Sequence, residues 1–337
     1  MAEITGPMSR SRPLPWVSWR CLPCAPETGG AADSLSNDQE PSDGERDTAL
    51  VCVTAGWQVR MVGELDDHDR VAEPHHMNRD ERPAADFVAA LASEIQGVLG
   101  DDLVGLYLYG SSVTGGFDPG VSDIDLVAVT SPEVGALDLA SLEQMQHAFV
   151  SRYPEWGDRL EIVYVGRATL QSFRTSPGSL AVISPGEPFH VRDERVAEWL
   201  QNWYLVREAG ICLYGADAAA IVPPIAWTEF VAATVRYADE VRNRSSPGAG
   251  GGVLAYTILT MCRALRTVRT QTHGSKQEAA AWTRERMPEW AWLIDAALKC
   301  RLSRGTIGFE DERSRAAAET FIVFLADEIH GRITNRV

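Results

Sequence analysis

The chain has 337 residues, 45% of them hydrophobic, and a formal net charge of −16 at pH 7. This length predicts about two packed domains, and the acidic balance argues against nucleic acid or an anionic membrane as a partner, because both demand a basic surface. No apolar run approaches the roughly 18 residues of a membrane span, and the N-terminus lacks a basic segment followed by an apolar stretch, so we expect a cytoplasmic protein.

Residues 1–80 contain clusters of Pro, Gly, Ser, Asp and Glu, which predict a mostly disordered N-terminal extension. Cys21 and Cys24 form a single CxxC pair with no second pair, so a zinc site is not expected there. The six cysteines of the chain are too scattered for a disulfide framework, and we expect them to be reduced.

The patterned part of the chain begins near residue 82. Residues 84–99 have the apolar spacing of a helix, and Leu103–Tyr109 has the branched and aromatic character of a buried strand. Gly110 and Ser111 end that strand with a turn whose backbone N–H groups can face phosphate oxygens, and the Ser111 hydroxyl adds a donor. We expect a short helix after this turn.

Two carboxylates open the next expected strand, at 123–129. The strand period of two places Asp123 and Asp125 on one face, while Ile124 points into the core. Two carboxylates this close repel each other unless a divalent cation lies between them, so they predict a metal site for phosphoryl or nucleotidyl transfer. Ser122, directly before Asp123, can donate to a phosphate or act as a plain strand cap.

A third acid lies on a third expected strand, at 159–165, which follows a helix-like segment at Leu139–Arg152. Glu161 interrupts the apolar pattern of this strand, and a carboxylate in a core strand is costly unless it meets a cation or a hydrogen-bond partner. We therefore predict that Glu161 is a third metal ligand or a general base.

From about residue 192 the pattern predicts helices only. They are expected at 196–208, 225–242, 253–270, 276–286, 290–302 and 311–332. The chain is thus expected to have three parts: the extension at 1–80, a mixed α/β domain at 82–190 and a helical domain at 191–332.

A Gly-Ser pair, eleven further residues, an Asp-x-Asp and a later strand-borne Glu together resemble the nucleotidyltransferase superfamily. Residues 258–265 and 273–282 are similar to the C-terminal helical signature of aminoglycoside adenylyltransferases of the streptomycin/spectinomycin 3″(9) type. The resemblance covers about residues 82–330. It implies an α+β fold, with an N-terminal polymerase-beta-like mixed sheet and helices followed by a C-terminal α-helical bundle.

The resemblance also implies a reaction. ATP would bind with its triphosphate at Gly110 and Ser111, and Mg²⁺, two ions being the expected number, would bind to Asp123 and Asp125. Glu161 would accept the proton of an attacking hydroxyl on an aminoglycoside or aminocyclitol, which is a small cationic acceptor. AMP would be transferred to that hydroxyl and pyrophosphate would leave. The family precedent suggests a monomer.

Two basic residues of the second part match positions with which the family holds the β- and γ-phosphates, namely Arg263 and Lys276. A solvated basic face is the alternative for Arg263, because Arg266 and Arg269 follow it at helical spacing. Trp282 lies at an aromatic position of the family, where packing is favoured over ligand contact.

The acceptor side departs from the family pattern. Glu187 lies in a Gly-Glu-Pro where the family has Gly-Glu-Trp, and residues 245–248 are Ser-Ser-Pro-Gly, with Asp239 and Glu240 as the nearest acids. Two alternatives therefore stay open: a nucleotidyltransferase that acts on a protein or another metabolite, and a non-catalytic nucleotide-binding module.

The family-like region begins near Pro83, shortly after Met61 and Met77. We hypothesise from this that the physiological start of the protein lies downstream of Met1. Intact-mass measurement on protein from its native host would contradict this hypothesis if residues 1–60 were present.

Overall fold

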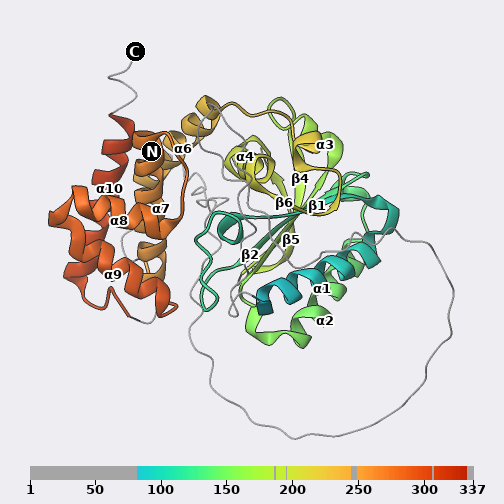
Figure 1. Ribbon diagram of the computed structural model, residues 1–337, viewed down its shortest axis with the longest axis horizontal. Helices are drawn as coiled ribbons and strands as arrows, with labels where there is room; N and C mark the ends of the chain where they lie inside the picture. Colours follow the sequence, from blue (N-terminus) through green and yellow to red (C-terminus); the bar gives the residue numbers. More distant parts are fainter. Residues whose placement is uncertain (1–81, 186, 195, 244–248, 306, 332–337) are drawn as a thin grey trace, which may run out of the picture.

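The computed structural model describes residues 82–331, apart from 186, 195, 244–248 and 306. The expected N-terminal extension, with its CxxC pair and both internal methionines, lies outside the described residues. The described chain forms a mixed α/β structure with a sheet followed by a helical region (Figure 1). None of the described helices is long and apolar enough to cross a membrane.

One sheet organises the first part of the described chain, with the strand order β5-β4-β3-β2-β1-β6. β2 and β3 are parallel, and the other neighbouring strands are antiparallel. The strands are β1 (Leu103–Tyr109), β2 (Ile124–Thr130), β3 (Leu160–Gly166), β4 (Gly178–Ser184), β5 (Glu187–Glu194) and β6 (Ile211–Gly215).

Helices cover both faces of this sheet, because alternate side chains of the central strands point to opposite sides. Leu126 and Ile162 join the core under α1 (Arg82–Leu99) and α2 (Leu139–Arg152), and Figure 1 shows these two helices together on one side of the sheet. Val127 and Val163 join the opposite core, under α3 (Arg167–Gln171) and α4 (Leu200–Ala209).

The helical region packs around α7 (Gly251–Thr270), which buries side chains along most of its length, including Ile258, Leu259 and Leu265. α8, α9 and α10 surround it, and Figure 1 shows these helices to one side of the sheet in orange and red. The helices of this region are α5 (Ala218–Ile221), α6 (Trp227–Asn243), α7, α8 (Lys276–Arg286), α9 (Ala291–Leu302) and α10 (Glu312–His330).

The structure corrects two expectations about local structure. β6 returns the chain to the sheet beside β1, where helices alone were expected, because Ile211 and Leu213 pack against the core under α1. The Gly-Ser turn itself is a short 3₁₀ helix at Gly110–Ser112, and turns and loop follow it in place of the expected short helix, since the Gly- and Pro-rich sequence there disfavours a helix. We therefore propose that the sheet-containing part of the chain extends to about residue 222.

Candidate active site

The three predicted acids come together on the central strands. Asp125 lies opposite Tyr109 in the antiparallel β1–β2 pair and beside Glu161 in the parallel β2–β3 pair. Asp123, Asp125 and Glu161 each keep part of their surface accessible, whereas Ile124 is buried in the core, as the strand period predicts. The Tyr109 hydroxyl donates a hydrogen bond to Glu161 Oε1 at 3.2 Å, so one carboxylate oxygen of Glu161 has a fixed partner.

The Gly-Ser turn passes directly over the Asp125 carboxylate. Gly110 has a φ of +70°, and a β-carbon at this position would overlap the Asp125 carboxylate. Only glycine combines this backbone conformation with so close an approach. The backbone N–H of Ser111 donates to Asp125, so this amide, expected to face a phosphate, contacts the carboxylate instead.

The environment of the three acids favours their neutral, protonated forms. Burial raises the pKa of Asp123 to about 7, and the negative charge of Glu161 adds to this. Burial also raises the pKa of Glu161 to about 7 and that of Asp125 well above its ordinary value. Asp123 Oδ1 is buried without a hydrogen-bond partner among the described residues. A cation at this point would therefore restore the ionised carboxylates.

The acids can supply part of the ligand set of a Mg²⁺ ion. No group of three or more His, Cys, Asp and Glu side chains within the described residues is arranged to hold a metal ion, so Glu161 does not complete a closed cage with the two aspartates in this geometry. Mg²⁺ is commonly held by one or two carboxylates together with substrate phosphates and water. Asp123 and Asp125 suit that arrangement, because their pKa values are raised and Asp123 Oδ1 has no hydrogen-bond partner among the described residues.

Lys276 brings a positive charge to these acids from the helical region. It begins α8, directly after Ser275, whose side chain accepts a hydrogen bond from the Glu278 N–H at 3.1 Å in a capping box. Burial lowers the pKa of Lys276 to about 7, and the charges of Arg263 and Arg301 lower it further, while Asp123 and Asp125 oppose the shift. The ammonium group lies 3.9 Å from the centroid of the Tyr256 ring.

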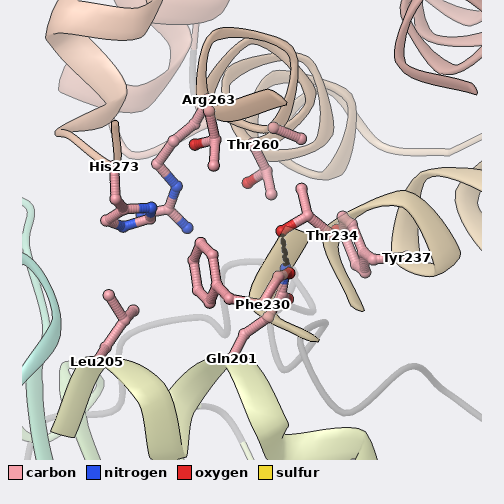
Figure 2. Close-up of a pocket in the computed structure, with 10 residues that line it drawn as sticks. Gln201, Leu205, Phe230, Thr234, Tyr237, Thr260, Arg263 and His273 are labelled. Atoms are coloured by element: carbon pink, nitrogen blue, oxygen red, sulfur yellow. Dashed lines mark hydrogen bonds between the residues drawn. The ribbon is translucent and has the colours of Figure 1, made fainter. Parts of the chain in front are cut away.

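Arg263 faces a small pocket between the sheet part and the helical region, and Figure 2 shows its guanidinium next to the His273 ring. Arg263 makes no ion pair with any other described residue, whereas Arg266 and Arg269 pair with Glu278 and Glu328. The pocket is lined by Gln201, Leu205, Phe230, Thr234, Tyr237, Thr260, Arg263, Ala264, Thr267 and His273.

His273 stays neutral in this pocket. Burial lowers its pKa to about 3, and the charges of Arg263 and Arg266 act in the same direction. Neither of its ring nitrogens has a hydrogen-bond partner among the described residues, and the ring meets Phe230 edge-on at 5.4 Å. The pocket thus offers neutral hydrogen-bonding groups beside one guanidinium.

Ser122 is occupied by protein partners. Its Oγ accepts hydrogen bonds from the Asp118 N–H at 2.8 Å and from Arg301 Nη2 at 3.0 Å, and its backbone oxygen accepts from Arg159. Sequence reasoning missed Arg301 because it lies 179 residues from Ser122 in a stretch with no recognisable motif.

Two acids on the expected acceptor side already have partners. Glu187 Oε2 lies 3.0 Å from Arg192 Nη2 and 3.7 Å from His190 Nε2, and both Glu187 and Arg192 act electrostatically on Glu161. Asp239 of α6 lies 3.1 Å from His330 Nδ1 of α10, so it links these two helices. Trp282 packs against the core of the helical region, which confirms the packing expectation.

Comparisons with known proteins match both parts of the chain. A family model described as a nucleotidyltransferase domain matches residues 93–166, and one described as the C-terminal domain of aminoglycoside adenylyltransferase matches residues 220–327. No curated protein matches the chain. A solved structure of similar fold is spectinomycin adenyltransferase AAD(9) from Enterococcus faecialis with ATP and spectinomycin; it is 18% identical, with a TM-score of 0.55, over 73% of this chain and 99% of that chain.

Proposed function

Since the chain is an aminoglycoside adenylyltransferase-like nucleotidyltransferase, we propose that it transfers AMP from ATP to a hydroxyl group of a cationic aminoglycoside or aminocyclitol. The observation that carries the proposal is the meeting of three carboxylates on β2 and β3 with Lys276 from α8. Such a site attracts both a metal cation and a polyphosphate.

In this proposal, the basic residues bind the nucleotide. Lys276 and Arg263 hold the β- and γ-phosphates from the helical side, and the Gly110–Ser111 turn, with the Ser111 hydroxyl, meets the triphosphate from the sheet side. Mg²⁺ bound to Asp123 and Asp125 would neutralise negative charge on the phosphate oxygens.

Glu161 is the proposed general base. Its pKa of about 7 suits a group that accepts a proton near neutral pH, and the Tyr109 hydroxyl holds one of its oxygens while the other stays available. The acceptor oxygen forms a bond to the α-phosphorus as the bond between that phosphorus and the α–β bridging oxygen breaks. The hydroxyl proton passes to Glu161, and pyrophosphate leaves.

A cationic acceptor is proposed on the basis of charge. The carboxylates of the site and the overall net charge of −16 favour ammonium groups on the acceptor. The similar fold of a protein crystallised with ATP and spectinomycin supports an aminocyclitol as the first candidate.

The test is pyrophosphate release from ATP and Mg²⁺ with a panel of acceptors containing spectinomycin, streptomycin and other aminoglycosides. We expect release with at least one drug, loss of Mg²⁺-dependent ATP binding in Asp123→Ala, and retained ATP binding with a turnover about 100- to 10,000-fold lower in Glu161→Gln. Near wild-type turnover in Glu161→Gln would exclude Glu161 as the base.

The same assay separates the alternatives. Release with none of the drugs, but with AMP appearing on a protein or a non-cationic metabolite, would replace the acceptor and keep the transfer chemistry. ATP binding without pyrophosphate release for any acceptor would support a nucleotide-binding module.

A further inference from the structure

We propose that Arg301 is a third cationic residue of the nucleotide site and binds the terminal phosphates of ATP together with Arg263 and Lys276. This inference rests on the proposed function and assigns a phosphate-binding role to a residue outside the sequence motifs.

Arg301 reaches from the helical region to the loop before β2. It lies in the last turn of α9, its side chain is 17% exposed, and its guanidinium points across to the loop before β2. There Nη2 lies 3.0 Å from Ser122 Oγ, and Nη1 lies 3.7 Å from Asp118 Oδ2. Because Ser122 directly precedes Asp123, the guanidinium lies next to the acids at the start of β2.

Arg301, Lys276 and Arg263 lie close enough for their positive charges to repel one another. Burial lowers the pKa of Lys276, and the charges of Arg263 and Arg301 lower it further; burial also lowers the pKa of Arg301, where Arg263 acts in the same direction and Asp118 and Asp123 oppose it. Three cations that repel one another at partly buried positions are costly without nearby anions. Asp118, whose Oδ2 lies 3.7 Å from Arg301 Nη1, and the acids of β2 offset part of this repulsion, and a polyphosphate would add further negative charge.

Other arginines also hold the loop before β2. Arg304 donates two hydrogen bonds to the Gly120 oxygen, at 3.1 and 3.0 Å, and Arg159 donates to the Ser122 oxygen. Arg301 contacts the same loop through one hydrogen bond, to Ser122, and through the longer ion pair with Asp118. A guanidinium has five N–H donors, so Arg301 keeps donors for a contact with phosphate beside its contacts with Ser122 and Asp118.

The experiment measures binding to the full-length protein by calorimetry in Mg²⁺, with ATP, AMP and inorganic pyrophosphate as separate probes. Arg301→Gln is expected to weaken ATP and pyrophosphate binding about 10- to 100-fold and to change AMP binding less than about 2-fold, since AMP lacks the terminal phosphates. Arg301→Lys keeps the charge and is expected to restore part of the loss.

Arg304→Gln is the matched control. Arg304 contacts the same loop but its side chain is 48% exposed and its ion pair is with Asp158, so its removal is expected to leave the ratio of ATP to AMP affinity unchanged. Melting curves without nucleotide verify that each variant is folded.

Three results would overturn the inference: unchanged ATP affinity in Arg301→Gln, equal losses for ATP and AMP, or the same selective loss in Arg304→Gln. Failure of the proposed function gives a different pattern. In that case the wild-type protein itself binds no ATP, or it binds ATP and adenylylates none of the acceptors while the Arg301 effect on ATP binding persists.

Discussion

Gly110 and Gly115 have nearly the same backbone conformation, with φ of +70° and +74°, but different surroundings. A β-carbon at Gly110 would overlap the Asp125 carboxylate, whereas a β-carbon at Gly115 would meet nothing within 4 Å. Both substitutions to alanine therefore carry the cost of left-handed backbone, about 1 kcal/mol, but only one displaces a carboxylate of the site.

We expect Gly110→Ala to lower Mg²⁺-dependent turnover at least about 10-fold beyond any effect of Gly115→Ala, while both lower the melting temperature. Turnover and thermal melting, measured on both variants, test this. Equal turnover in the two variants would show that the close approach to Asp125 has no role in the reaction.

At the level of single residues, the sequence predicted the acids but not their surroundings. Asp123, Asp125 and Glu161 stand out because charge interrupts apolar strands. Tyr109, which bonds Glu161, and Arg301, which bonds Ser122, carry no such signal, because their partners lie 52 and 179 residues away and only the fold brings them together.

Among the elements, α8 has a direct link to the site, since its capping box positions Lys276. Ser275→Ala removes the acceptor for the Glu278 N–H and is expected to cost about 1 kcal/mol of stability and to weaken ATP binding, because the first turn of α8 frays.

Asp138→Ala, which removes the N-cap of α2 on the far face of the sheet, is the control. It is expected to lower the melting temperature in a similar way and to leave ATP affinity unchanged. Calorimetric titration with ATP and thermal melting compare the two variants. An equal loss of ATP affinity in both would mean that stability alone, not the position of Lys276, governs binding.

The sequence predicted long and strongly patterned elements better than short edge strands. The bounds of α2 and α8 are confirmed to the residue. β4, β5 and β6 were not predicted, and the last two were missed for physical reasons. β5 carries Glu187, His190, Arg192 and Asp193 at the edge of the sheet, and β6 has five residues between two helices, too few for a periodic signal.

For the whole molecule, the shifted pKa values predict how stability without ligands depends on pH. In the folded state the pKa of Asp123 and that of Glu161 are about 7, whereas their ordinary pKa values are 3.8 and 4.5. The folded state therefore binds more protons than the unfolded state in this range, and stability falls as the pH rises to 7. Lys276 loses its proton near pH 7, against 10.5 ordinarily, so stability rises with pH above 7.

Melting temperatures of the ligand-free protein between pH 5 and 9 test this. We expect this cluster to contribute a stability minimum near pH 7, with Asp123→Asn flattening the acid side and Lys276→Met flattening the alkaline side. Identical pH profiles in the wild type and both variants would show that these groups have ordinary pKa values.

After β6 returns to the sheet, the described chain leaves the sheet for good, so the residues of the site fall into two separate stretches of the sequence. The acids lie between residues 110 and 161 and the cations between 263 and 301, and in the described chain β6 is followed by helices only. Each contiguous half therefore carries part of the proposed nucleotide site, with the three acids in the first half and Arg263, Lys276 and Arg301 in the second. If the chain were cut near residue 222, ATP and its metal would contact both fragments. Substrate binding would therefore promote reassociation of the two fragments.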